Sequence, residues 1–192
     1  MLIYIHGFNS SPASHKAQLL QAKLETLGRG GEFIAPALPH SPAQAAALLD
    51  ALVAHHPGAS LVGSSLGGYY ATYLAERHDL KAVLLNPAVR PYELLEPLVG
   101  RQKNLYTGEE YDLTPQHLSE LRSLEVGGIT PGRYLLVAAT GDEVLDYRCA
   151  VERYRGCRQL VIAGSDHGLS DFEEYLDLVL AFCGVGRLDQ RS

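Results

Sequence analysis

Ten residues from Ala59 to Gly68, Ala-Ser-Leu-Val-Gly-Ser-Ser-Leu-Gly-Gly, place a serine between glycines at the end of a short apolar run. A strand can turn sharply into a helix only where small residues flank the turn, and the turning residue then holds its side chain clear of the backbone. The pattern predicts a strand, a sharp turn at Ser65 and a helix that begins at Leu66. The free N–H groups at the start of that helix favour negative charge, so Ser65 is a candidate nucleophile.

Short runs rich in leucine, valine and isoleucine alternate along the chain with longer stretches of helical period. This alternation is typical of a parallel sheet covered by helices on both faces. We predict six strands, near Leu2–Ile5, Glu32–Ala35, Ser60–Val62, Ala82–Leu85, Tyr134–Ala139 and Gln159–Ala163.

Capping patterns mark the expected helix starts. A serine or threonine followed by proline supplies an N-cap and a first helical residue, and a serine three residues before a glutamate forms a capping box. The candidate caps are Ser14, Ser41 before Pro42, Thr114 before Pro115, and Ser170 in Ser170-Asp171-Phe172-Glu173.

The 192 residues are expected to form a single domain, residues 1–192, with a polar tail over 184–192 that frays. Residues 90–131 are longer than one crossover helix requires. They predict either a small cap or two ordinary helices that cover the sheet, and the sequence favours neither.

Composition and charge exclude several classes of partner. The net charge is −6 and the basic residues form no stripe, so we expect no nucleic-acid or membrane binding. The apolar start, residues 1–5, is too short for a signal peptide or a spanning helix. Three cysteines without Cys-x-x-Cys spacing favour reduced thiols over a disulfide or zinc site. We therefore expect a cytoplasmic protein without a metal site.

An aspartate and a histidine follow two later strands at positions that can complete a catalytic triad with Ser65. Asp142 comes soon after the predicted strand 134–139, and His167 after the strand 159–163. The carboxyl ends of parallel strands lie at one edge of a sheet, so we expect the three side chains to converge there. A serine hydroxyl becomes reactive when a histidine accepts its proton and a carboxylate orients that histidine.

Other acidic residues lie close to the same strand ends. Asp146 is the alternative orienting acid, and Glu143 is a weaker candidate. Asp166 adjoins His167, but neighbouring side chains in an extended loop point apart. We therefore expect Asp166 to fix the loop rather than to orient the imidazole.

The loop after the first strand is a candidate oxyanion loop. The backbone N–H groups of Phe8 and Leu66 would be its two donors. His6 is expected to shape this loop, because the sequence places no carboxylate to orient it as a base. Ser10 and His40 are candidates for lining the substrate pocket, although both residue types are also common in ordinary turns.

Five sequence blocks occur in an order that is specific when taken together, and they span nearly the whole chain. The blocks are His6-Gly7-Phe8-Asn9-Ser10-Ser11-Pro12, Gly63-Ser64-Ser65-Leu66-Gly67-Gly68, Asn86-Pro87-Ala88, Thr140-Gly141-Asp142-Glu143-Val144-Leu145-Asp146-Tyr147 and Gly164-Ser165-Asp166-His167.

The chain resembles, on these blocks, the small bacterial YqiA/YcfP-type esterases of the α/β-hydrolase superfamily. The resemblance implies a three-layer fold, with a mainly parallel six-stranded sheet of order 2-1-3-4-5-6 and a small helical cap. It also implies a serine hydrolase of carboxylic esters that needs no metal or cofactor. Ser65, Asp142 and His167 match the triad positions of that family.

The leading hypothesis is therefore an esterase that forms an acyl-enzyme on Ser65, with small to medium acyl groups as substrates. Thioesterase, lipase-like and peptidase activities use the same triad and stay open. A different class is a non-catalytic module that binds an anion at residues 63–68. Against it, the chain has neither a Gly-x-Gly-x-x-Gly motif after the first strand nor a P-loop lysine.

Overall fold

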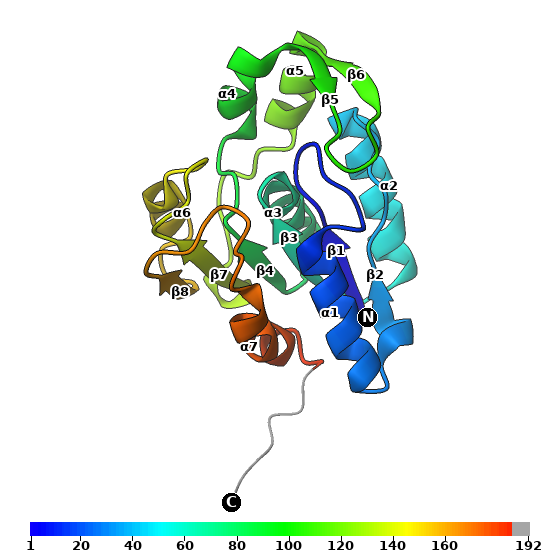
Figure 1. Ribbon diagram of the computed structural model, residues 1–192, viewed down its shortest axis with the longest axis vertical. Helices are drawn as coiled ribbons and strands as arrows, with labels where there is room; N and C mark the ends of the chain where they lie inside the picture. Colours follow the sequence, from blue (N-terminus) through cyan, green and yellow to red (C-terminus); the bar gives the residue numbers. More distant parts are fainter. Residues whose placement is uncertain (186–192) are drawn as a thin grey trace, which may run out of the picture.

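One parallel sheet forms the centre of the computed structural model, in the strand order β2-β1-β3-β4-β7-β8 (Figure 1). This order is the predicted 2-1-3-4-5-6, which is thereby confirmed. The structure describes residues 1–185, so residues 186–192 of the predicted tail lie outside it. The strands are β1 (Leu2–Ile5), β2 (Phe33–Ile34), β3 (Ser60–Ser64), β4 (Ala82–Leu85), β7 (Tyr134–Ala139) and β8 (Arg158–Ile162).

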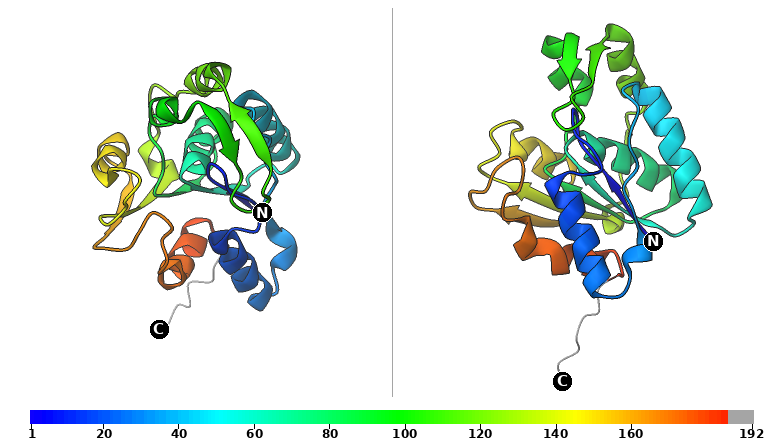
Figure 2. Two further views of the ribbon diagram at one scale, coloured as in Figure 1. Left: turned by 45° about the horizontal axis from the view of Figure 1, so that its top comes forward. Right: turned by 45° about the vertical axis from the view of Figure 1, so that its right-hand side comes forward.

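Helices cover both faces of this sheet, as Figure 2 shows. Successive strand side chains point to opposite faces, so each apolar strand supplies two cores. Ile3 and Leu61 pack with α2, α3 and α6 on one face. Leu2 and Val62 pack with α1 and α7 on the other. The helices are α1 (His15–Thr26), α2 (Pro42–His55), α3 (Leu66–His78), α6 (Tyr147–Arg153) and α7 (Leu176–Phe182).

Two of the predicted helix caps are confirmed. Ser41 accepts a hydrogen bond from the N–H of Gln44 at the start of α2. Thr114 forms a capping box with His117 at the start of the next helix, α5 (Pro115–Ser123). Both caps precede a proline, whose missing N–H costs nothing at a helix start.

The other two predicted caps differ from the structure. Ser14 stands at the N-cap of α1, but its hydroxyl donates to the hydroxyl of Tyr4 and makes no cap bond. The capping box predicted at Ser170 is wrong. A 3₁₀ turn, Phe172–Tyr175, precedes α7 there, and the N–H of Ser170 donates to Asp166.

Residues 90–131 lie over the carboxyl edge of the sheet (Figure 1). Besides the expected helices they contain an antiparallel hairpin that the sequence analysis did not predict. We call this segment the cap. Its elements are α4 (Pro91–Leu95), a 3₁₀ turn (Glu96–Leu98), β5 (Gly100–Lys103), β6 (Glu110–Leu113), α5, and a 3₁₀ turn (Pro131–Arg133) that begins at its last residue.

Among residues 1–185, none of the helices is both long and apolar enough to cross a lipid bilayer.

Candidate active site

The turn from β3 into α3 forces Ser65 into a strained backbone conformation. Its φ is 53° and its ψ is −119°, values that residues other than glycine rarely adopt. The glycines on either side make the turn possible. A Cβ on Gly67 would overlap the carbonyl oxygen of Ile5, and one on Gly63 would overlap Gly67. The N–H of Ser65 donates to Leu85 at 3.0 Å, which ties the turn to β4.

The loop after β1 lies directly against the serine. A Cβ built on Gly7 would be 3.2 Å from Cβ of Ser65 and 3.7 Å from its Oγ. The backbone of the predicted oxyanion loop therefore comes as close to the hydroxyl as a glycine allows.

The loops after β7 and β8 are bonded to one another. The N–H of Gly141 donates to the carbonyl of Gly164 at 3.0 Å, and the N–H of Gly164 donates to the hydroxyl of Thr140 at 2.9 Å. A Cβ on Gly141 would overlap the carbonyl oxygen of Ser165. These contacts bring Asp142 and His167, 25 residues apart in the chain, to one place at the sheet edge.

Asp142 and His167 form a hydrogen-bonded pair. Nδ1 of His167 lies 2.9 Å from Oδ2 and 3.0 Å from Oδ1 of Asp142. The aspartate side chain is 1% exposed and the histidine side chain 21% exposed. An acceptor-only carboxylate requires that Nδ1 carry the proton, which leaves Nε2 free to accept one.

Asp142 is stabilised in its charged form. Burial alone would raise the pKa of its carboxyl group, but hydrogen bonds from His167 and from the N–H groups of Leu145 and Val144 lower that pKa below its ordinary value. The two backbone bonds measure 2.8 and 2.9 Å. An ionised aspartate at this position can orient the imidazole of His167 through its Nδ1–H.

The other acidic residues near the pair have different contacts. Asp146 accepts from the N–H of Arg148 at 3.0 Å and caps α6. Asp166 accepts from the N–H of Ser170 at 3.0 Å. Glu143 accepts from the backbone N–H of His167 at 3.0 Å. Each of these three carboxylates therefore accepts a hydrogen bond from a backbone N–H, whereas the imidazole of His167 is hydrogen-bonded to Asp142.

Asn86, which follows β4, holds the histidine loop in position. Its side-chain amide donates to the carbonyls of Asp166 at 3.0 Å and His167 at 3.1 Å, and its amide oxygen accepts from the N–H of Ala139 at 2.8 Å. The residue is 3% exposed and has a φ of 41°. Asn86 stands in one of the five sequence blocks, but the sequence alone indicated no role for it.

Lys16 on α1 supports the same loop from the other face. Its ammonium donates to the carbonyl of Gly168, and the side chain is buried. Burial lowers the pKa of Lys16 to about 8, although the charges of Asp166 and Asp142 act in the opposite direction.

The segment from Asn86 to Ala88 links the serine to the histidine loop. The N–H of Ala88 donates to the carbonyl of Ser65 at 3.1 Å, two residues after Asn86 contacts His167. Within the described residues no hydrogen bond joins the Ser65 hydroxyl to the imidazole of His167. Catalytic hydrogen bonds are often long or poorly aligned until substrate binds.

Two backbone N–H groups beside Ser65 are free to bind an anion. Leu66 is the first residue of α3, so its N–H has no acceptor within the helix. No carbonyl or side chain of residues 1–185 accepts a hydrogen bond from the N–H of Phe8. Both residues line a cavity of about 50 Å³.

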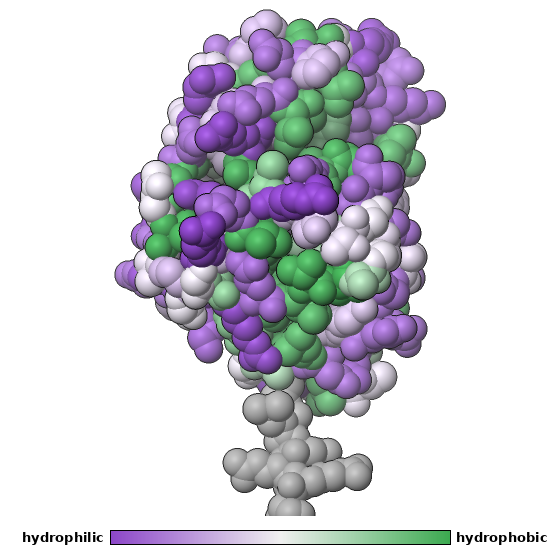
Figure 3. Space-filling model, turned by 90° about the vertical axis from the view of Figure 1, so that its left-hand side faces the viewer, coloured by the Kyte–Doolittle hydropathy of each residue, from purple (hydrophilic) through white to green (hydrophobic). Residues whose placement is uncertain are grey.

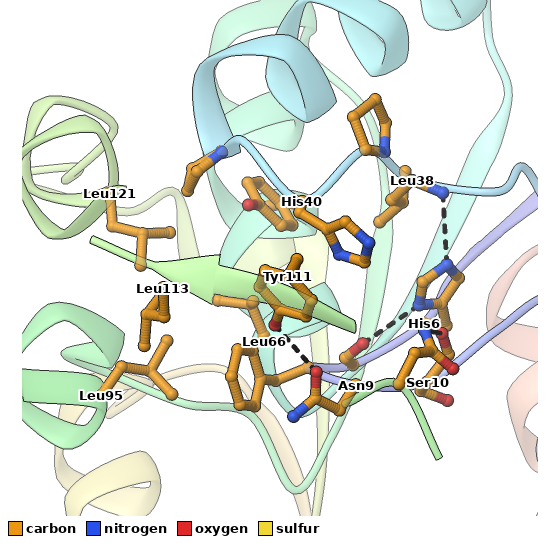
Figure 4. A pocket seen from close by; sticks show the side chains of 16 residues that line it. His6, Asn9, Ser10, Leu38, His40, Leu66, Leu95, Tyr111, Leu113 and Leu121 are labelled. Carbon is orange, nitrogen blue, oxygen red and sulfur yellow. Dashed lines mark hydrogen bonds between the residues drawn. The ribbon is translucent and has the colours of Figure 1, made fainter. Parts of the chain in front are cut away.

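This small cavity also contains Ser10 and His40, the two predicted pocket residues (Figure 4). Leucines close it at the cap end, where Leu95, Leu113 and Leu121 point toward one another. A cavity of this volume has room for only a few atoms, since one water needs about 10–15 Å³.

His6 shapes the predicted oxyanion loop through both ring nitrogens. Nδ1 donates to the carbonyl of Gly7 at 3.0 Å, and Nε2 accepts from the N–H of Leu38 at 3.4 Å. Burial lowers the pKa of His6, although the bond to Gly7 acts in the opposite direction. A neutral imidazole with its proton on Nδ1 satisfies both partners.

The cap hairpin is fixed to the predicted oxyanion loop. The ring of Tyr111 stacks on His40 with centroids 3.7 Å apart, and its hydroxyl donates to Asn9 at 2.8 Å. The side-chain amide of Asn104 donates to the carbonyl of Ser10 at 2.9 Å. His40 also lies 3.3 Å from a carboxylate oxygen of Glu109. The cap thus contacts Asn9 and Ser10, the two residues that follow Phe8.

The parallel sheet with its sharp serine turn and covering helices is the α/β-hydrolase fold, and solved structures of that class superpose on it. A protein from Agrobacterium vitis S4 has a TM-score of 0.78 at 21% identity, covering 95% of this chain and 87% of the other. The esterase domain of a Rhodothermus marinus protein has a TM-score of 0.67 at 17% identity, covering 94% and 85%.

The chain belongs to the uncharacterised protein family UPF0227, whose model matches residues 1–184. It is 25% identical to the UPF0227 protein YcfP of Salmonella paratyphi A over 193 aligned positions, which cover 97% of this chain and all of the relative. A UPF0227 protein of Citrobacter koseri is equally similar. The resemblance to YcfP-type proteins is thereby confirmed.

Proposed function

We propose that this protein is a serine hydrolase that cleaves carboxylic esters of small to medium acyl groups through an acyl-enzyme on Ser65. One observation carries the proposal. A buried carboxylate bonds Nδ1 of His167 at 2.9 Å, at the same sheet edge as a serine in a strained turn. An ionised aspartate keeps the imidazole proton on Nδ1, and Nε2 can then accept the proton of the serine hydroxyl.

In the first half-reaction the Ser65 oxygen attacks the ester carbonyl carbon as Nε2 of His167 takes the hydroxyl proton. The carbonyl oxygen becomes an oxyanion, and the N–H groups of Phe8 and Leu66 stabilise it. The bond to the alcohol oxygen then breaks. That oxygen takes the proton from His167 and leaves as the alcohol.

In the second half-reaction water attacks the acyl-enzyme. His167 removes a proton from the water, the same two N–H groups bind the new oxyanion, and the acid departs as Ser65 regains its proton. Asp142 stabilises the imidazolium in both halves. Every group in this scheme belongs to the chain, and water is the only co-substrate.

Solved structures that share the fold agree with this class. An esterase domain and Est1E from Butyrivibrio proteoclasticus, solved with ferulic acid, share the fold at 17% identity. Identity at that level supports the fold, and the residues named above support the chemistry.

We also propose a cytoplasmic location. Cys149, Cys157 and Cys183 are all free thiols in the described chain, which suits a reducing compartment.

Hydrolysis of p-nitrophenyl acetate and of a matched short-chain acyl thioester by the purified protein tests the proposal. We expect the ester to be hydrolysed, and Ser65→Ala to reduce kcat at least 10³-fold with the fold intact by circular dichroism. Retained activity in Ser65→Ala would remove the nucleophile assignment. Turnover of the thioester without the ester would make the protein a thioesterase.

A further inference from the structure

A second cavity, of about 700 Å³, opens between α6, the cap and α3. Val89 and the start of the cap, up to Leu94, form one wall, residues 124–126 of the cap a second, and residues 145–154 a third. Figure 3 faces the side on which α6 and α4 lie, and it shows apolar side chains in the middle of that face with hydrophilic ones beside them. The volume falls within the range of about 300–1,000 Å³ that small-molecule sites occupy, unlike the small cavity beside Phe8.

Two wall residues of this large cavity connect it to the proposed catalytic residues through backbone N–H groups. Leu145, on its wall, donates its N–H to Oδ1 of Asp142 at 2.8 Å. Pro87, also on its wall, precedes Ala88, whose N–H donates to the carbonyl of Ser65 at 3.1 Å. The cavity therefore lies on the Asp142 side of the serine, whereas the small cavity lies on the oxyanion side.

The floor of the cavity offers no unsatisfied polar group. The hydroxyl of Tyr69 donates to the carbonyl of Leu121 at 2.8 Å. Tyr154 and Thr72 share a hydrogen bond of 2.8 Å between their hydroxyls, and Thr72 donates to Gly68 at 2.8 Å. A ligand on this floor meets aromatic and aliphatic surface and needs no polar partner there.

The charged groups at the rim are matched within the protein as well. Mixed charges that are already paired give a charged ligand little net attraction. The ion pairs are Arg90 with Glu93 (3.7 Å), Arg148 with Asp146 (3.4 Å) and Glu152 with Arg155 (2.5 Å). Glu125 accepts a hydrogen bond from the hydroxyl of Tyr92 at 3.0 Å.

Arg153 uses its guanidinium to fix one wall to another. It donates to the carbonyls of Val126 and Gly127, which follow α5 in the cap. The cavity therefore has braced walls around a floor of aromatic and aliphatic surface.

We propose that this cavity binds the leaving group of the ester, and that this group is a neutral apolar alcohol or phenol with more than one ring or an equivalent alkyl chain. The inference rests on the proposed function. His167 must protonate the departing oxygen, so the alcohol leaves on the side of the His167–Asp142 pair, where the large cavity opens. The acyl group then extends toward the small cavity beside Phe8 and is short.

Phenyl acetate and 2-naphthyl acetate test this assignment, because their phenols differ in size far more than in acidity. We expect kcat/KM for 2-naphthyl acetate to exceed that for phenyl acetate at least tenfold in the unchanged protein. Leu94→Trp, which fills the cavity from α4, and Cys149→Trp, which fills it from α6, should each reduce this ratio about tenfold.

The matched control is Leu48→Trp, another partly exposed leucine on a helix, which lies outside the cavity. It should leave the naphthyl-to-phenyl ratio unchanged. Phenyl octanoate supplies the other arm. If the cavity-filling variants reduced turnover of phenyl octanoate and spared the naphthyl preference, the cavity would hold the acyl group and the assignment would be overturned.

Binding of 2-naphthol to the Ser65→Ala protein separates this inference from the proposed function. We expect saturable binding, followed by naphthol fluorescence, that Leu94→Trp weakens about tenfold and Leu48→Trp does not. Binding without ester turnover by the unchanged protein would sink the proposed function and leave a ligand site. Turnover without naphthol binding would overturn the leaving-group site alone.

Discussion

The side-chain amide of Asn86 donates a hydrogen bond of 3.1 Å to the backbone carbonyl of His167, across 81 residues of sequence. The same amide donates to Asp166, and its oxygen accepts from Ala139 on β7. One buried side chain therefore fixes the histidine loop to the ends of β4 and β7. The imidazole can face Asp142 only while that loop keeps its place.

Asn86→Asp should reduce kcat 10- to 100-fold with KM changed less than twofold. The second carboxylate oxygen would face two carbonyls that need a donor, and a small displacement of a catalytic group has effects of this size. Steady-state kinetics with p-nitrophenyl acetate measure the split. Asn86→Ser, which can still donate one bond, should recover part of kcat. If kcat fell only in proportion to the folded fraction, Asn86 would support the fold and would not position His167.

Asp142→Asn should reduce kcat about 10³- to 10⁴-fold, because an amide can hold the imidazole in the wrong tautomer. Asp146→Asn should stay within about threefold of the unchanged protein, since asparagine also caps a helix well. Parallel kinetic measurement of the two variants decides which acid orients His167. Similar losses in both would contradict the assignment to Asp142.

Lys16 makes the free energy of unfolding depend on pH in the alkaline range. The pKa of Lys16 is about 8 in the folded chain, below its ordinary value of 10.5, so between these values the unfolded chain binds the extra proton. Its contribution therefore makes the free energy of unfolding rise with pH in that window, by up to about 1 kcal/mol per pH unit. Urea unfolding at pH 7, 8, 9 and 10 should show a shallower rise for Lys16→Met. Identical slopes in the two proteins would contradict the buried ammonium.

Tyr111→Phe should lower the free energy of unfolding by about 1 kcal/mol and reduce kcat severalfold. The change keeps the stack on His40 but removes the hydroxyl bond to Asn9, next to Phe8, the proposed oxyanion donor. Tyr106→Phe, at the exposed tip of the hairpin, is the matched control and should alter neither quantity. A loss of stability with unchanged kcat would show that the hairpin stabilises the fold without positioning the proposed oxyanion donor.

The sheet could be predicted from the sequence because its strands are apolar on both faces. β3, β4 and β7 are buried at every residue, so each appears as an uninterrupted apolar or small-residue run. The hairpin could not be predicted by the same signal. β5 and β6 are Gly-Arg-Gln-Lys and Glu-Tyr-Asp-Leu, largely charged and half exposed, and only their contacts with the oxyanion loop and His40 show their position.

The supports of the candidate site were harder to predict than its central residues. Ser65, Asp142 and His167 follow strand ends, where topology implies a meeting point. Asn86 donates to main-chain carbonyls of a loop 80 residues away. Such a contact leaves no pattern of side chains in the sequence from which it could be predicted. Lysine is usually a surface residue, and the burial of Lys16 depends on how α1 packs beneath that loop.

Labelling with a fluorophosphonate tests the central claim most directly, because only an activated serine displaces fluoride from the probe. We expect one covalent adduct per chain in the intact mass spectrum, located on Ser65 by peptide mapping. The adduct should be absent from Ser65→Ala and at least 100-fold slower to form in His167→Ala. A folded protein that takes no label, or one labelled at another residue, would contradict it.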